Sequence, residues 1–417
     1  MKATKVSILV AVTALVYTGG CKLACGDQIS NSAAAMIDRY ISFDDIARPG
    51  VALEQCWNAM GIDEAERVYI GFTSRRSDGR EDFALFRYDP VTAERLFLGT
   101  FIDASQATGN LLPNEEIPKG HTHMLEIGGK MYMASQGFHD FKAAIDTLPE
   151  YRGAHLYAYD LARGKLEDLS ASLPGGVVIE HHGIVALSYM PGYEFLVGLA
   201  HPSSDIILFD YNHNKVREIV PGIPWRLGNP LSRELVVTNK GKIYTYRGTE
   251  DPAQRGEVNN IWAFDLKTFA MIRTVNTATG GFWDGQTSTR DGQTIYVSTV
   301  NGELYKLDVE KDVFTHLGHF LPEKDYEAGV RVEYLYGITL SAEEKRIFGI
   351  PRTSRSAESN LYSYEIATGE VTLVEKLETA IYTGSDMHDS HGNIYFARFG
   401  DEEAWSGKVR LAILHPS

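Results

Sequence analysis

The sequence predicts an all-β protein, a seven-bladed β-propeller of four-stranded antiparallel blades, from two recurring marks. The first mark is an aromatic residue, once a leucine, followed by an acidic residue and a polar turn. It occurs at Tyr88-Asp89, Tyr159-Asp160, Phe209-Asp210, Phe264-Asp265, Leu307-Asp308 and Tyr364-Glu365. A repeating unit of roughly 40–55 residues made of short strands is typical of propellers.

The second mark is a tight turn that leads into a strand, and it occurs seven times. These turns precede Val68-Tyr69, Met131-Tyr132, Tyr193-Glu194-Phe195, Ile243-Tyr244, Ile295-Tyr296, Ile347-Phe348 and Ile394-Tyr395. Glycine and asparagine in such turns supply the positive φ that a two-residue hairpin needs. In each unit the hairpin joins strands A and B, and the acidic mark falls between strands C and D. We therefore expect seven blades over residues 50–417, with terminal segments paired to close the ring.

The amino terminus reads as an export signal. Basic residues in Met1–Lys5 precede the apolar stretch Val6–Val16, which is too short to span a bilayer. Thr18-Gly19-Gly20-Cys21 then resembles a bacterial lipobox, in which the cysteine is lipidated after cleavage; an ordinary signal peptide cut nearby is the alternative. We expect residues 1–21 to be this signal and residues 22–49 to be an extension before the propeller. The protein would be a bacterial outer-membrane lipoprotein, or periplasmic or secreted.

The net charge and the cysteine content limit the kinds of partner that the protein is expected to have. The formal net charge of −15 argues against nucleic acid and against an anionic membrane surface, so the lipid on Cys21 would be the contact with a membrane. We expect a monomer. Of the three cysteines, Cys25 and Cys56 either pair in an oxidising compartment or remain two thiols.

Topology decides which residues meet at one mouth of the central tunnel. The starts of the A strands and the B–C loops share a face, and the A–B hairpins lie opposite. The candidates at strand starts are His121, His123, His182, Arg233, Trp283 and Tyr336, and those in B–C loops are His139, Tyr246, Arg352 and Arg355. The opposite face carries acidic residues such as Glu344, and His388 is set aside because it falls in a hairpin there.

Several of these residues have a plain structural alternative. His121 and His123 are either a metal-binding pair or two hydrogen-bonded strand histidines. Arg233 could bridge a blade seam, and Trp283 could be core packing. A metal held by these histidines would be a divalent ion, either Zn²⁺ or Ca²⁺. The sequence requires no redox cofactor, and it contains no nucleotide-binding glycine motif.

Specific motifs resemble the propeller polysaccharide lyases, and among these the seven-bladed ulvan lyases. Gly120-His121-Thr122-His123, Gly128–Tyr132 and Gly137-Phe138-His139 are similar to the second blade of that family. The carboxy-terminal segments Gly384-Ser385-Asp386, Asp389-Ser390 and Gly392–Phe399 strengthen the resemblance. The resemblance implies an exported lyase that cleaves a uronic-acid-containing, anionic polysaccharide by β-elimination, with histidines, a tyrosine and an arginine in its site.

Under this resemblance, His123 and Tyr246 are the base and the acid in either order, and Arg233 neutralises the substrate carboxylate. His139 and His121 hold the acidic sugar or a metal. The remaining substrate-binding candidates are His182, Trp283, Tyr336, Arg352 and Arg355. Two other functions stay open: a non-catalytic propeller that binds carbohydrate or a partner at the cell surface, and a metal-dependent hydrolase or oxidoreductase that uses the histidines.

Overall fold

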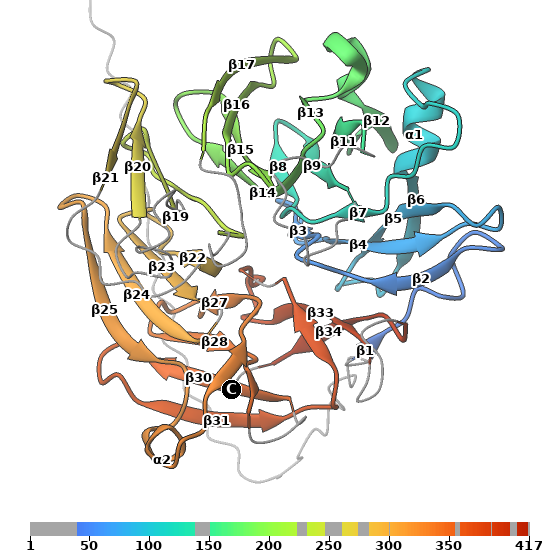
Figure 1. Cartoon of the computed structure of the whole chain (residues 1–417). Helices are drawn as coiled ribbons and strands as arrows, with labels where there is room; N and C mark the ends of the chain where they lie inside the picture. The colour runs from blue at the N-terminus through green and yellow to red at the C-terminus, as the bar shows by residue number, and fades with distance from the viewer. Residues whose placement is uncertain are drawn as a thin grey trace, which may run out of the picture. The chain divides into compact units, whose positions relative to one another are not determined.

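Seven antiparallel sheets follow one another around a ring in the computed structural model of the chain (Figure 1). The structure describes residues 40–137, 151–222, 232–246, 261–273, 283–299, 301–354, 359–384, 386–400 and 407–415. At Tyr246, Arg273, Trp283 and Asp284 it describes the backbone alone. The predicted fold class, an all-β propeller of seven four-stranded blades, is confirmed.

In the first two blades the inner strand is broken into two pieces. Blade one contains β2 (Ala52–Gln55), β3 (Met60–Ile62), β4 (Val68–Arg75), β5 (Glu81–Tyr88) and β6 (Arg95–Thr100), and α1 (Phe101–Ala107) follows it. Blade two contains β7 (Lys119–Gly120), β8 (Leu125–Ile127), β9 (Lys130–Gln136), β11 (Leu156–Asp160) and β12 (Lys165–Asp168). Beside it, β10 (Gly153–Ala154) pairs with β13 (Ile179–Glu180), and two short 3₁₀ turns span Leu169–Ser172 and Pro174–Gly176.

The next three blades are regular four-stranded sheets. Blade three is β14 (Gly183–Met190), β15 (Phe195–His201), β16 (Ile206–Asp210) and β17 (Lys215–Val220). Blade four is β18 (Val236–Val237), β19 (Lys242–Tyr246), β20 (Ile261–Asp265) and β21 (Ala270–Arg273). Blade five is β22 (Trp283–Ser288), β23 (Thr294–Thr299), β24 (Glu303–Asp308) and β25 (Val313–His319), followed by α2 (Glu323–Glu327).

The last two blades complete the ring. Blade six is β27 (Ile338–Leu340), β28 (Arg346–Gly349), β30 (Asn360–Glu365) and β31 (Val371–Lys376), with β26 (Val332–Tyr334) paired to β29 (Arg352–Thr353) beside it. Blade seven is β32 (Ile381–Thr383), β33 (Ile394–Phe399), β34 (Arg410–Leu414) and β1 (Tyr40–Ile41).

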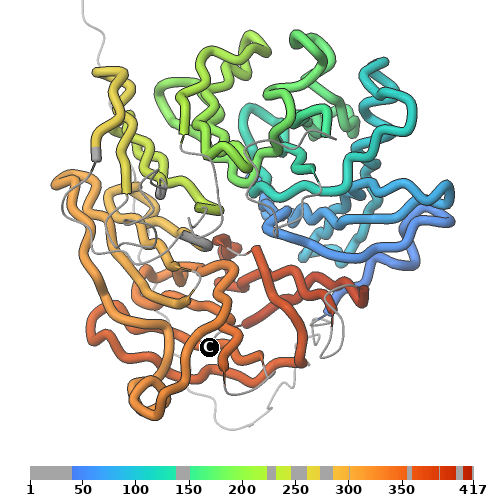
Figure 2. Tube along the Cα trace, viewed as in Figure 1, coloured from blue at the N-terminus to red at the C-terminus, as the bar shows by residue number. Residues whose placement is uncertain are grey.

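The ring closes by pairing the two ends of the propeller. Tyr40 pairs with Ala412 and Ile41 with Leu411, so the first strand supplies the outer edge of blade seven (Figure 2). The Thr383 hydroxyl also donates to the Cys56 carbonyl oxygen at 2.7 Å, which joins blade seven to blade one. The predicted pairing of terminal segments is therefore present, and the ring begins at Tyr40 rather than at residue 50.

Both sequence marks have the structural role that was predicted for them. Gly128 and Gly129 adopt φ of 58° and 76° between the paired residues Ile127 and Lys130, as a two-residue hairpin requires. In the turn between β5 and β6, the Asp89 carboxylate accepts hydrogen bonds from the backbone amides of Val91 and Thr92. The short acidic side chain thus closes the C–D turn, which explains why the mark recurs.

The core lies between the blades. In β4, all residues except the last are buried, because a propeller sheet packs against a neighbouring blade on each face. Cys56 is part of this core as a free thiol, and burial raises its pKa to about 12. The disulfide alternative therefore does not hold for Cys56, and Cys21 and Cys25 lie outside the described residues. No helix in the described ranges is long and apolar enough to cross a membrane.

Candidate functional site

Aromatic and cationic side chains from four blades gather where the inner strands begin. We call Trp57, Lys119, Arg233, Tyr334 and Tyr336 the cationic mouth. The Trp57 ring meets the Tyr336 ring edge-on with 5.7 Å between centroids, and Tyr334 stacks on Tyr336 at 5.3 Å. The Lys119 ammonium lies 5.8 Å from the centre of the Trp57 ring, and the Arg233 guanidinium lies 5.4 Å from that of Tyr336. Each cation is thus within range of a ring face.

Lys119 has an unusual protonation equilibrium for a lysine. Its burial, together with the positive charge of Arg233, lowers the pKa of Lys119 to about 8, although the Glu81 carboxylate opposes the shift. Both effects disfavour the charged ammonium form. A substantial fraction of Lys119 is therefore a neutral amine at slightly alkaline pH, which is the form that can accept a proton.

His123 lies deeper, in the break between β7 and β8. There the chain leaves the sheet, and the Met124 amide donates instead to the Met60 carbonyl oxygen of blade one at 2.8 Å. His123 Nε2 lies 2.9 Å from Glu234 Oε1, and His123 Nδ1 lies 3.6 Å from Asp386 Oδ1. Gln286 Nε2 donates to the second Glu234 oxygen at 3.1 Å. Side chains from four blades therefore meet around one imidazole.

The two carboxylates keep His123 positively charged. Although burial opposes the charged form, Asp386 and Glu234 raise the pKa of His123 to about 10. An imidazolium has no lone pair with which to take a proton. The role of base that the resemblance suggested for His123 therefore conflicts with its surroundings, whereas the role of proton donor agrees with them.

The structure brings two of the predicted site residues, Arg233 and Tyr336, into contact, and it connects His123 to the chain neighbour of Arg233. His123 binds Glu234, which is adjacent in the chain to Arg233, and Arg233 lies against Tyr336. Arg352, on β29, pairs with Tyr334 of β26, which belongs to the cationic mouth. The Arg352 Nε atom also lies 3.8 Å from Glu333 Oε2.

Two predicted histidines have other surroundings. His121 is buried, and its Nδ1 lies 3.1 Å from the Val185 carbonyl oxygen, so that it joins the inner strands of blades two and three. His182 Nδ1 lies 2.6 Å from the Glu180 carbonyl oxygen, a local contact within its own loop. These contacts support the hydrogen-bonded alternative for His121 and do not place His182 beside Arg233.

The other predicted residues are described incompletely or not at all. Tyr246 ends β19 and Trp283 begins β22, but their side chains are not described. His139 and Arg355 lie outside the described residues. The described ranges contain no group of three or more His, Cys, Asp or Glu side chains that could hold a metal ion, so the metal proposed for the histidines stays a prediction.

Sequence reasoning missed several residues of this region. Lys119 directly precedes Gly120-His121 at the start of a predicted strand, and Trp57 is one of five tryptophans, so position and rarity were both available signals. Glu234 directly follows Arg233, which is one of the candidates that the sequence proposed. Nothing in the sequence indicated that it would bind His123.

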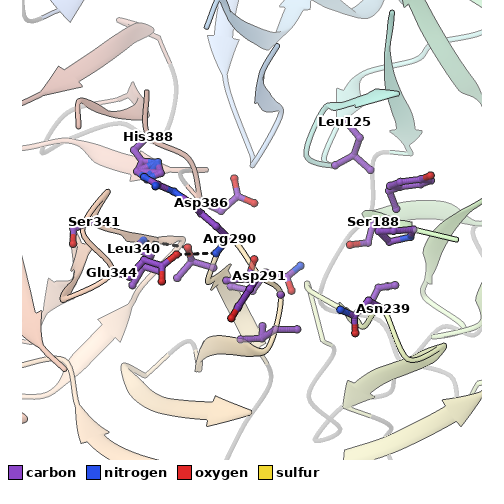
Figure 3. A pocket seen from close by; sticks show the side chains of 18 residues that line it. Leu125, Ser188, Asn239, Arg290, Asp291, Leu340, Ser341, Glu344, Asp386 and His388 are labelled. Atoms are coloured by element: carbon purple, nitrogen blue, oxygen red, sulfur yellow. Dashed lines mark hydrogen bonds between the residues drawn. The ribbon is translucent and has the colours of Figure 1, made fainter. Parts of the chain in front are cut away.

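A separate cavity of about 520 Å³ lies at the hairpin face (Figure 3). Its lining includes Asn239, Arg290, Glu344 and His388 from the A–B hairpins, together with Asp386. None of the proposed site residues whose side chains the structure describes lines it. The tunnel region therefore has two chemically different ends, and His388, which was set aside, lines the second.

Comparisons with known proteins identify the fold. No known family and no curated protein matched the chain. The structure of U3-55K is similar with a TM-score of 0.54 at 9% identity, covering 87% of this chain and 98% of that one. The crystal structure of the RRP9 WD40 repeats has a TM-score of 0.55 at 9% sequence identity and covers 88% of this chain and 97% of its own. A chain of the mitotic checkpoint complex has a TM-score of 0.52 at 8% sequence identity and covers 95% of this chain and 100% of its own. At such identities the likeness concerns the propeller fold alone.

Proposed function

We propose that the cationic mouth binds the carboxylate of an acidic sugar, within a uronic-acid-containing polysaccharide. The observation that carries this proposal is the pairing of two cations, Lys119 and Arg233, with the ring faces of Trp57 and Tyr336. A guanidinium binds a carboxylate through two parallel hydrogen bonds. Aromatic rings give the apolar face of a sugar a surface on which to pack.

The same residues supply the groups that β-elimination needs, which makes a lyase the second candidate. Arg233 would neutralise the carboxylate, so that the α proton becomes acidic enough to remove. The neutral amine of Lys119 would take that proton with its lone pair. The electron pair of the broken C–H bond would then form the carbon–carbon double bond as the glycosidic C–O bond breaks, and the Tyr336 hydroxyl or the His123 imidazolium would protonate the departing oxygen.

This assignment differs from the one that the resemblance implied. We assign the base to Lys119 rather than to His123, because the lowered pKa of Lys119 makes a neutral amine accessible while the carboxylates around His123 hold its proton. The side chain of Tyr246 is outside the described part of the structure, so its role stays a prediction. The acid that protonates the departing oxygen is either His123, as in the earlier assignment, or Tyr336. Substrate binding would extend toward Arg352, whose strand pairs with that of Tyr334.

Binding is tested with a polyuronate and a neutral glucan as paired probes, using calorimetry. Arg233→Gln should weaken polyuronate binding about 10-fold to 100-fold, the worth of a hydrogen bond to a charged group. Arg217→Gln is the matched control, because Arg217 is exposed on the outer strand β17 and should leave binding unchanged. Equal affinity for the neutral glucan, or unchanged binding by Arg233→Gln, would contradict the proposal.

Turnover is followed in the same samples through the ultraviolet absorbance of the unsaturated uronate product. Lys119→Gln should lower the rate about 10²-fold to 10⁴-fold, the usual effect of losing an acid–base group. Tyr336→Phe separates the two acids, because it slows turnover if the Tyr336 hydroxyl donates the proton and leaves it unchanged if His123 does. A wild-type protein that binds polyuronate without producing this absorbance would exclude the lyase and leave the binding proposal standing.

A further inference from the structure

The cavity at the hairpin face is formed by parts of six blades. It is lined from blade two at Leu125 to blade seven at Asp386 and His388, and its volume of about 520 Å³ is within the range of small-molecule sites. Figure 3 shows Asp386, Arg290 and Asp291 toward its middle, with Ser188 and Asn239 across from them. The lining combines these polar side chains with the apolar side chains of Leu125, Val237 and Leu340.

Two of its three carboxylates already have partners within the hairpins. Glu344 Oε1 accepts from the Arg290 backbone amide at 2.8 Å. Asp291 Oδ1 accepts from the Thr289 hydroxyl at 2.7 Å and from the Gln293 amide at 2.9 Å. These two side chains shape the hairpins, and their negative charges remain at the cavity edge.

The cations of the lining do not balance these charges. The Arg290 guanidinium donates to the Ala342 carbonyl oxygen at 2.9 Å and so is directed to the neighbouring hairpin. Burial, together with the charge of Arg290, lowers the pKa of His388, which is therefore mainly neutral at pH 7. Three carboxylates thus face the Arg290 guanidinium, and the positive charge of His123 beside Asp386 is offset by Glu234, so the lining and its immediate surroundings carry a net negative charge.

Asp386 is the carboxylate that is open to a ligand. Its side chain is 34% exposed, and its ionic contact in the described part of the chain is with His123 Nδ1 at 3.6 Å, beyond hydrogen-bond distance. Among the residues that the structure describes, no group is within hydrogen-bond distance of that Nδ1, although the His123 side chain is only 9% exposed. The ion pair is therefore long, and it leaves the Asp386 oxygens without a hydrogen bond from His123, so that they can accept one from a ligand.

We propose that this cavity binds a small hydroxylated primary amine, such as an amino sugar, through an ion pair between its ammonium group and Asp386. The net charge of the lining selects a cation and disfavours an acid. Hydroxyls of the ligand meet the polar side chains of Ser188, Asn239 and Ser288. The proposal concerns a different surface and a ligand of opposite charge from those of the cationic mouth, and the two regions are linked through the contact between Asp386 and His123.

The test compares ligands of one shape and different charge by calorimetry. Glucosamine should bind the wild-type protein at least about 10-fold more tightly than N-acetylglucosamine, which lacks the ammonium group, because a hydrogen bond to a charged group is lost. Glucuronate should bind still more weakly here. Because this comparison needs no variant, it does not depend on how a substitution affects folding. Equal binding of the first two ligands would overturn the proposal.

Variants then locate the site. Asp386→Asn should weaken glucosamine binding about 10-fold or more, whereas Glu310→Gln, an exposed acidic residue outside the lining, should not. Unchanged binding by Asp386→Asn would contradict the assignment. Arg233→Gln should keep normal glucosamine affinity, so that failure at the cationic mouth and failure at this cavity are distinguished.

Discussion

His123 shows how a few contacts fix the chemistry of a residue. The Glu234 and Asp386 carboxylates hold its proton, so that a histidine in the tunnel region is a permanent cation near neutral pH. Removing one partner of a buried pair is costly because the other charge is left uncompensated. His123 therefore stabilises the junction of the inner strands in addition to any part in catalysis.

Stability should depend on pH through this pair, and the sign follows from the raised pKa. Because the folded pKa is about 10 and the ordinary value is 6.5, the stabilisation is full below pH 6.5 and is lost as pH rises through 10. His123→Gln should cost about 3–5 kcal/mol at pH 6. The difference from wild type should shrink toward pH 10 in urea unfolding.

An exposed pair is the control for this experiment. His316 Nε2 lies 2.7 Å from Glu303 Oε2, and the His316 side chain is 47% exposed. His316→Gln should change the free energy of unfolding by less than about 1 kcal/mol. A His123→Gln protein as stable as the His316→Gln protein at pH 6 would contradict the buried ion pair.

Lys119 acts on stability with the opposite sign. Its folded pKa of about 8 is below its ordinary value of 10.5, so the unfolded chain binds its proton more tightly. The cost of burying the charged amine is full below pH 8 and is relieved as pH rises toward 10.5. A residue that costs stability in this way, at the start of an inner strand, is typical of a functional position.

At the scale of elements, the short strand β1 closes the ring. It adds two residues to the edge of β34, of which Ile41 is buried. Closure of this kind covers an edge that would otherwise expose unpaired backbone groups. The ring thus depends on a segment that precedes the first hairpin of the repeat.

A truncation should show this dependence. A protein that begins at Ser42 should be less stable than one that begins at Asp38 by about 1.5–3 kcal/mol, the worth of burying one isoleucine, and more prone to aggregate. The measurement is the urea midpoint of the two forms, with size-exclusion chromatography for aggregation. Equal midpoints would show that β1 contributes nothing to closure.

At the scale of the whole molecule, the two ends of the tunnel region differ in charge. The cationic mouth collects Lys119 and Arg233, whereas the hairpin cavity collects Asp386, Asp291 and Glu344. One propeller can present two ligand surfaces because its A–B hairpins and its strand starts lie at opposite ends of the same inner strands. The two proposals therefore concern different surfaces of one chain.

Location in the cell is also a property of the whole molecule. We propose that Cys21 carries a lipid after cleavage and anchors the protein to a bacterial membrane. In a bacterial host, Cys21→Ser should move the protein from the membrane fraction to the soluble fraction, and Cys25→Ser should not. Fractionation and mass spectrometry of the mature terminus measure this. A Cys21→Ser protein that stays with membranes, or a terminus beyond Cys25, would refute the anchor.

The sequence alone determined the plan of the fold. Seven hairpins and the acidic C–D turns were visible because their causes are local: positive φ at Gly128 and Gly129, and a carboxylate that closes a turn at Asp89. The alternation of strand and turn then set the number of blades and the face on which Arg233 and Tyr336 meet.

Tertiary structure decided the chemistry. Glu234, which holds the proton of His123, lies 111 residues away in the chain, and no local rule links the two. Burial and Arg233 change the pKa of Lys119, and the cavity around Asp386 exists only once several hairpins converge. Protonation and ligand space depend on which charges and surfaces come close in space, and the folded ring, rather than the order of residues, sets those distances.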